Sequence, residues 1–225
     1  MIIFIALPAF RDTVFPSSDG SFDFEDVWEL ICLAVAFFGS AIRVYTVGHV
    51  PEGTSGRNRS VQRADVLNTT GAYSLVRHPL YVGNFFIWLG ISMFVRSWWL
   101  SLIFILLFVL FYERIIFAEE GYLRKEYGKA WGDWAARTPP FVPRFKNFKP
   151  AALPFSVRSV LTKEYHVLFN IILAFAVIEI LEGLFTDHKF ELDFAWMVAV
   201  AAGLAAWITL RVLKKKTNVL HVEGR

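Results

Sequence analysis

The chain has a single cysteine, Cys32, among its 225 residues. One cysteine excludes an intrachain disulfide and a cluster of thiolate metal ligands, and we interpret Cys32 as a small residue packed inside a helix. No internal repeat or low-complexity tract is present, and no cluster of residues predicts a metal site. The chain also lacks a large excess of one charge sign, because it has 23 Lys and Arg residues and 20 Asp and Glu residues. The net charge of +3 does not indicate nucleic-acid binding, and membrane lipids are the expected partners of the basic residues.

Apolar residues, by contrast, are abundant. They make up 56% of the chain and the mean hydropathy is +0.46, which is more than a soluble domain of this size needs for one core. We therefore predict an all-α, polytopic membrane protein. A spanning helix needs about 20 mostly apolar residues. Five stretches approach that length: 28–48, 80–95, 99–118, 165–185 and 194–213.

The second and third stretches are separated only by Arg96 and Ser97. Residues 80–95 are short for a full crossing, but the tight connection predicts a helical hairpin whose two helices are antiparallel neighbours. The first ten residues are apolar and too short to span a membrane. They lack the basic start and cleavage site of a secretory signal, so we expect an interfacial or re-entrant segment.

The charges between these stretches predict their orientation, since cytoplasmic loops carry the excess of Lys and Arg. Acidic residues dominate before the first stretch (Asp19, Asp23, Glu25, Asp26 and Glu29) and between the last two (Asp187, Glu191 and Asp193, with Lys189). Basic residues mark the 49–79 loop (Arg57, Arg59, Arg63 and Arg77), the 119–163 stretch and the tail (Arg211, Lys214, Lys215 and Lys216). We therefore expect five crossings, with the N-terminus outside and the C-terminus in the cytoplasm.

The first polar segment of interest is residues 67–83, LNTTGAYSLVRHPLYVG. Pro79 fits the first turn of a helix, and His78 before it should be extended. Arg77 and His78 would then lie at the membrane surface, next to a helix N-terminus whose free N–H groups can bind an anionic group. Tyr81 follows within the first turn. The alternative is that these side chains only reach for lipid phosphates.

The second segment runs from Tyr112 to Pro143. Charged residues there lie at the membrane edge, where an unpaired charge is costly. Glu120 is one turn from Arg124 and could form a surface ion pair with it. Glu119 has no such partner in its helix, so we favour it as a ligand-binding group. Gly128 is predicted to end the helix, and Arg137 precedes an extended Thr-Pro-Pro stretch that can hold it over a pocket.

These two segments resemble the isoprenylcysteine carboxyl methyltransferase and phospholipid methyltransferase group of membrane enzymes. The resemblance rests on GAYSLVRHPLYVG and EEGYLRKEYGKAWGDWAARTPPFVP and covers residues 65–145. One departure is that Trp131 and Trp134 stand where the family usually has tyrosine. Residues 1–225 would then form one membrane domain: 1–64 with the first span, 65–145 as the methyltransferase-like core and 146–225 with two further spans.

The resemblance implies a methyltransferase that uses S-adenosylmethionine in a cytoplasmic pocket between the hairpin and the following helix. It implies catalytic roles for Arg137, His78 and Glu120. The residues that it implies for cofactor binding are Tyr73, Arg77, His78, Tyr81, Gly83, Glu119, Glu120 and Leu123.

The chemistry of the cofactor agrees with these residues. It carries two cationic groups and a carboxylate, which Glu119 and Arg77 can match. Methyl transfer is an in-line displacement that needs alignment and the exclusion of water, and neither a metal nor a covalent nucleophile is required. Arg137 could orient a carboxylate acceptor, whereas an amine acceptor would need His78 or Glu120 as a base.

Two other classes of function stay open. Membrane sterol reductases that use NADPH have a similar Arg-His-x-x-Tyr-x-Gly segment, and Asn84 resembles their next residue, but Pro79 and the Glu-Glu-x-x-Leu block argue against them. A silent membrane scaffold or a small transporter is the other alternative. The methyl acceptor, lipophilic or small, and the oligomeric state are not indicated by the sequence.

Overall fold

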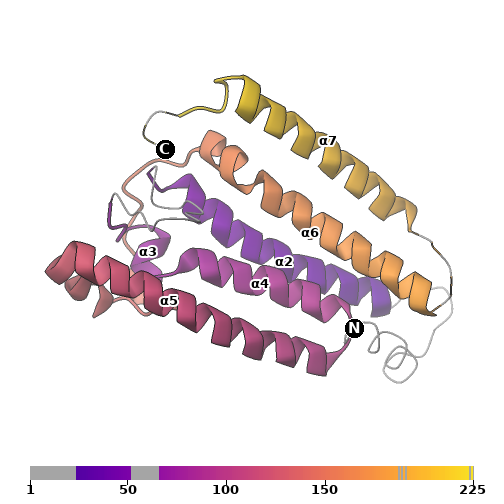
Figure 1. Ribbon diagram of the computed structural model, residues 1–225, viewed down its shortest axis with the longest axis horizontal. Helices are drawn as coiled ribbons and strands as arrows, with labels where there is room; N and C mark the ends of the chain where they lie inside the picture. The colour runs from indigo at the N-terminus through magenta and orange to yellow at the C-terminus, as the bar shows by residue number, and fades with distance from the viewer. Residues whose placement is uncertain are drawn as a thin grey trace. The chain divides into compact units, whose positions relative to one another are not determined.

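The computed structural model describes residues 24–51, 66–186, 188, 190, 192–222 and 224. The predictions for residues 1–10 and for the loop arginines Arg57, Arg59 and Arg63 lie outside these described residues, as do Asp19, Asp23, Asp187, Lys189 and Glu191. The described part of the chain contains helices and no strand, so the all-α prediction is confirmed. In chain order (Figure 1), the elements are α2 (Phe24–Gly48), α3 (Ala72–Leu75), α4 (Pro79–Phe94), α5 (Trp98–Ala135), η1 (Phe145–Asn147), α6 (Val157–Thr186) and α7 (Phe194–Lys216).

Four of these helices, α2, α5, α6 and α7, are long and apolar enough to cross a membrane. The fifth predicted crossing, α4, has 16 residues. At 1.5 Å per residue it measures about 24 Å, which is less than the hydrocarbon thickness of about 30 Å. The prediction of a polytopic membrane protein is confirmed, with α4 as a short apolar helix. Polar turns lengthen α5 and α6 beyond the predicted apolar stretches.

Helices α4 and α5 form the predicted hairpin. Three residues join them, and Arg96 among them has a positive φ of 58°. Trp88 of α4 lies against Phe104 of α5, with 6.4 Å between ring centroids. Phe85, earlier in α4, lies 5.3 Å from Phe108, later in α5. The pairing of earlier residues with later ones shows that the two helices run antiparallel.

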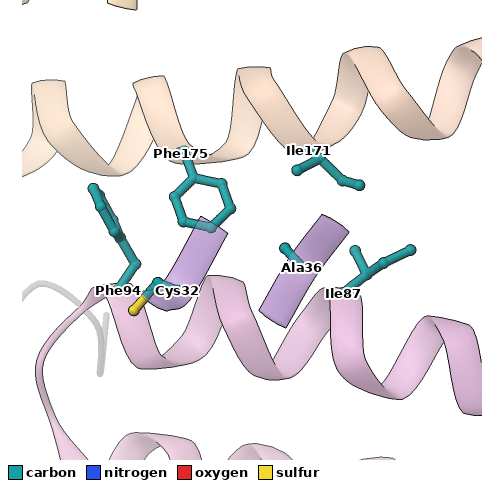
Figure 2. Close-up of a cluster of buried hydrophobic side chains, with 6 residues drawn as sticks. All are labelled: Cys32, Ala36, Ile87, Phe94, Ile171 and Phe175. Carbon is teal, nitrogen blue, oxygen red and sulfur yellow. The ribbon is translucent and has the colours of Figure 1, made fainter. Parts of the chain in front are cut away.

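The chain divides into two compact units, and each long helix contributes a part to both. Of the described residues, the first unit comprises those up to Ser40, those in Phe85–Phe108 and those in Tyr165–Arg211. The second unit comprises the described residues in Ala41–Asn84, Val109–Glu164 and Val212–Arg225. Figure 2 shows the core of the first unit, where side chains from α2, α4 and α6 meet. Its buried members are Cys32, Ala36, Ile87, Phe94, Ile171 and Phe175.

The hairpin turn is held by polar contacts within the same unit. The indole nitrogen Nε1 of Trp28 donates to the carbonyl of Met93 at 3.0 Å. The Arg96 guanidinium is buried between Glu29, 3.4 Å away, and Glu182, 3.6 Å away. Two carboxylates therefore compensate a cation that would be costly next to apolar helices. Glu182 of α6 is therefore part of a mostly buried ion pair.

Helix α4 approaches the backbone of α2 closely at Gly90. A Cβ atom on Gly90 would lie 2.5 Å from the carbonyl oxygen of Cys32 and 2.8 Å from the backbone nitrogen of Ala36. Both atoms belong to backbone, which cannot move aside as a flexible side chain can. Only glycine therefore permits this packing distance.

We expect Gly90→Ala to destabilise the protein by about 1–3 kcal/mol, because the added methyl group forces the two backbones apart. Gly121→Ala is the matched control. It makes the same change in a helix where no atom lies within 4 Å of the added Cβ, and it should gain about 0.5–1 kcal/mol of helix stability. Thermal unfolding of the purified variants in detergent tests this. Equal midpoints for the two variants would contradict the close approach.

Candidate functional site

The predicted site residues before α4 are held by a second stretch of chain. The backbone N–H of Arg77 donates to the carbonyl of Pro139 at 2.8 Å, and that of His78 donates to Pro140 at 3.3 Å. Pro79 begins α4, as predicted. A residue that precedes proline is driven into the extended conformation. The two hydrogen bonds pair the backbone of residues 77–78 with that of residues 139–140.

The Arg77 side chain spans three acceptors. Its Nε donates to Oε1 of Glu120 at 2.8 Å, and Nη1 donates to the carbonyls of Ala135 and Thr138 at 2.9 and 3.1 Å. Glu120 therefore pairs across helices, and the alternative of an ion pair with Arg124 is wrong. Arg124 lies instead over the ring of Trp131, 4.8 Å from its centroid.

His78 lies between two carboxylates and is buried. Its Nε2 is 3.0 Å from Oε1 of Glu120, and its Nδ1 is 3.6 Å from Oε2 of Glu119. Because an ionised carboxylate only accepts hydrogen bonds, Nε2 carries the proton in the contact with Glu120. Two donors, Arg77 and His78, thus share one oxygen atom of Glu120.

Glu119 has a different environment from its neighbour. Its Oε2 accepts a 2.7 Å hydrogen bond from the hydroxyl of Tyr81. The Tyr81 ring stacks on His78 at 5.3 Å between centroids and contacts Tyr112 edge-on at 4.9 Å. The side chain of Glu119 is 38% exposed, compared with 16% for Glu120. Glu119 is therefore the carboxylate of the pair that a ligand can reach.

The charges of this cluster do not cancel. Glu119 and Glu120 carry two negative charges, and the guanidinium of Arg77 carries one positive charge. The surplus negative charge lies on Glu119, because the Arg77 guanidinium contacts Glu120. In a half-buried setting, such a surplus favours a cation more than it would in water. The arrangement can therefore bind a positively charged group.

Three further residues were predicted to bind the cofactor, and their surroundings differ: Tyr73, Gly83 and Leu123. Burial and the nearby Glu119 carboxylate raise the pKa of the Tyr73 phenol above its ordinary value, so the hydroxyl stays protonated. The Tyr73 carbonyl accepts a hydrogen bond from Nε1 of Trp134 at 3.1 Å. Gly83 is buried in α4, and Leu123 is half-buried one turn after Glu119 in α5.

The side chain of Arg137 takes no part in the hydrogen bonds of the cluster among the described residues. Its side chain is exposed, and its Nε donates to the carbonyl of Asp133 at 3.0 Å. Trp131 and Trp134, next to this turn, are both buried. The indole N–H of Trp131 makes no hydrogen bond within the described part of the chain. Gly128, predicted to end the helix, breaks it with a φ of 50°, after which helical structure resumes as far as Ala135.

A buried polar network nearby was missed from the sequence. Arg43 of α2 donates from Nε and Nη2 to both carboxylate oxygens of Glu164, at 2.8 and 2.7 Å. Its Nη1 donates to Asn84 at 2.7 Å, and Asn84 donates to the hydroxyl of Tyr112 at 2.9 Å. Tyr112 in turn contacts the Tyr81 ring. The available signal was an arginine inside an apolar stretch, which is by default a functional or paired residue.

Comparison with known proteins finds a family model that matches part of the chain. Residues 28–130 match the model of the phospholipid methyltransferase family. The match covers most of α2, all of α3 and α4 and most of α5, with every residue predicted to bind the cofactor. It ends before Arg137 and before α6 and α7.

Three relatives align with part of the chain. The nickel-cobalt-cadmium resistance protein NccN of Alcaligenes xylosoxydans xylosoxydans is 35% identical over 133 residues, which are 58% of this chain and 59% of the relative. The cobalt-zinc-cadmium resistance protein CzcN of Cupriavidus metallidurans is 34% identical over 90 residues, 40% of this chain and 41% of the relative. The protein-S-isoprenylcysteine O-methyltransferase of Schizosaccharomyces pombe is 32% identical over 131 residues, 57% of this chain and 55% of the enzyme.

The chain thus spans about half the length of the relatives that it matches. No solved structure matches it significantly. The family model and the isoprenylcysteine methyltransferase together confirm the resemblance predicted from the sequence. Among the described residues, no group of three His, Cys, Asp or Glu side chains is placed to hold a metal ion.

We expect Arg43→Met to destabilise the protein by about 3–5 kcal/mol, because it leaves the buried Glu164 carboxylate without its partner. The double variant with Glu164→Met should be more stable than Arg43→Met alone, since no unpaired charge remains. Lys129→Ala is the control, because it breaks an exposed pair with Asp133 and should not shift the unfolding midpoint. A double variant no more stable than Arg43→Met would contradict the pairing.

Proposed function

We propose that the chain is a membrane methyltransferase that uses S-adenosylmethionine and modifies a lipophilic or small acceptor at the cytoplasmic face. The observation that carries the proposal is the unequal pair of adjacent carboxylates. Glu120 is hydrogen bonded to Arg77 and His78, whereas Glu119 is partly exposed and carries the surplus negative charge. The family match over residues 28–130 supports the reaction class.

The residues of the cluster fit both charges of the cofactor. Glu119 offers a carboxylate to a cationic group, oriented by the Tyr81 hydroxyl. Arg77 uses Nε and Nη1 on protein acceptors, and its Nη2 makes no hydrogen bond to a described residue. A guanidinium nitrogen in that position can receive a carboxylate. The buried N–H of Trp131 also requires an acceptor, which a bound ligand can supply.

When bound, S-adenosylmethionine supplies a methyl group attached to a positively charged sulfur. The chain's own contribution is to orient and to exclude water. Glu120 and the Pro140 carbonyl fix the imidazole and the backbone of His78. The Tyr81 hydroxyl holds Glu119, and the Tyr81 ring contacts the rings of His78 and Tyr112. A reactant held in this way needs little further rearrangement.

The acceptor is proposed as a class. A carboxylate or thiolate already carries its charge, and Arg137 could orient a carboxylate. For an amine acceptor, Glu120 and His78 would be the candidate bases. In the structure, however, these two side chains are hydrogen bonded to each other. This contact favours an acceptor that needs no deprotonation by the protein. The Schizosaccharomyces pombe relative acts on isoprenylcysteine, as its name states, which supports a lipophilic acceptor.

Isothermal titration of the purified protein should show binding of S-adenosylhomocysteine and no binding of NADPH. The expected result follows from a carboxylate surplus that suits a cationic amino acid moiety and repels the phosphates of NADPH. The same titration is the test of the reductase alternative. Binding of NADPH alone would refute the methyltransferase proposal.

We expect Glu119→Gln to weaken binding of S-adenosylmethionine at least tenfold, about 1.4 kcal/mol. The amide keeps an oxygen that can accept from Tyr81, so the variant removes mainly the charge. Glu126→Gln makes the same change on an exposed position of α5 and should leave the affinity unchanged. If Glu119 faces the sulfur, S-adenosylhomocysteine will lose less affinity than the charged cofactor. Unchanged affinity for both ligands would mean that the pocket lies elsewhere.

The acceptor class can be identified by incubating the protein with labelled S-adenosylmethionine and a total lipid extract, followed by mass spectrometry. Label in the lipid fraction is the expected result. If the label appears only in water-soluble thiols or amines, the acceptor is a small molecule and the proposal of a lipophilic acceptor is wrong.

A further inference from the structure

The connection between α5 and α6, residues 136–156, contains basic residues and no acidic ones. No Asp or Glu occurs between Asp133 and Glu164. The same 30-residue stretch contains six basic residues: Arg137, Arg144, Lys146, Lys149, Arg158 and Lys163. A surface of this kind attracts anions, and neighbouring carboxylates do not compensate it within the stretch.

The same connection exposes apolar side chains. Phe145 is 77% exposed and Val142 is 74% exposed, and Phe148 is also exposed. These residues alternate with Arg144, Lys146 and Lys149. Exposed apolar side chains, Phe included, next to Lys and Arg suit the boundary between a bilayer and water, where the apolar groups enter the headgroup region and the cations meet phosphates.

Backbone hydrogen bonds tie the connection to the ends of spanning helices. The N–H of Ser156 donates to the carbonyl of Gly48, the last residue of α2, at 2.9 Å. Pro139 accepts from Arg77, two residues before α4 begins. One residue after Ser156, α6 begins. The connection therefore lies at the level where three apolar helices begin or end, which is the edge of the bilayer.

We propose that residues 141–158 form a docking surface for the anionic headgroups of the bilayer that the protein's own helices span. Charge complementarity selects this partner, because the stretch is basic throughout and its exposed rings need an apolar surface beside the anions. The partner is the lipid surface itself, and an acidic protein would not bury the exposed rings at the membrane edge.

This contact would act on the site through backbone. Lys149 accepts from the N–H of Gly71 and donates its own N–H to Oγ of Ser74, both at 2.9 Å. The N–H of Arg144 donates to the carbonyl of Leu75 at 2.9 Å. The connection thus frames α3 and the segment that carries Arg77 and His78. Anionic lipid that binds the connection would stabilise this frame.

Spin labelling tests the proposal directly. In a Cys32→Ala background, Phe145→Cys and Lys129→Cys each introduce one site for a nitroxide label. Lys129, 88% exposed on the last part of α5, is the control. The full chain is reconstituted into phosphatidylcholine vesicles with or without phosphatidylglycerol, and relaxation by oxygen is compared with relaxation by a water-soluble nickel chelate.

We expect the label at position 145 to be more accessible to oxygen than to the chelate, and more so when phosphatidylglycerol is present. The label at position 129 should stay accessible to the chelate in both vesicles. High salt should reduce the effect of phosphatidylglycerol, since the Debye length falls to about 3 Å at 1 M. A label at 145 that behaves like the label at 129 in both vesicles would overturn the proposal.

A charge variant separates lipid recognition from simple burial. Arg144→Gln with Lys146→Gln should abolish the response of the 145 label to phosphatidylglycerol while the helices stay inserted. A response of unchanged size would show that the basic residues do not bind headgroups. The readout needs neither cofactor nor activity, so it is independent of the proposed methyl transfer.

Discussion

One oxygen atom of Glu120 supports the arrangement of the site. It accepts from Nε of Arg77 and from Nε2 of His78, and so fixes two side chains that precede α4 to a residue of α5. With this carboxylate compensated, the neighbouring Glu119 keeps its charge and part of its exposure. Adjacent residues of one helix thus have different surroundings: Glu119 is partly exposed, and Glu120 holds Arg77 and His78.

Each compact unit of the chain buries an arginine and pairs it with carboxylates. Arg96 contacts Glu29 and Glu182 in the first unit, and Arg43 contacts Glu164 in the second. A buried charge among apolar helices is tolerated when its partners are in place. Such pairs are specific rather than strongly stabilising, because only one register of the helices brings the charges together. They join α2, from the matched family region, to α6, which lies outside it.

The hairpin could be predicted from the apolar stretches and from Pro79, because helix starts and apolar runs depend on neighbouring residues in the chain. Gly128, predicted to end a helix, marks a break after which helical structure resumes. The sequence suggested Arg124 as the partner of Glu120, since only neighbours in the same helix are visible along a chain. The actual partners are 42 and 43 residues away. The Arg43 pair spans 121 residues, and no local pattern reports such a contact.

The three acceptors of Arg77, which are Glu120, Ala135 and Thr138, all come from one stretch of chain. Because all three must reach one guanidinium, the number of residues between Glu120 and Thr138 is fixed. This segment includes the end of the helix after Glu120, the break at Gly128 and the short helix that follows. One inserted residue would turn the helix by about 100° and move the carbonyls away from the guanidinium. Distant homologues of this chain should therefore be recognisable by the distance between these positions, even where the intervening residues have changed.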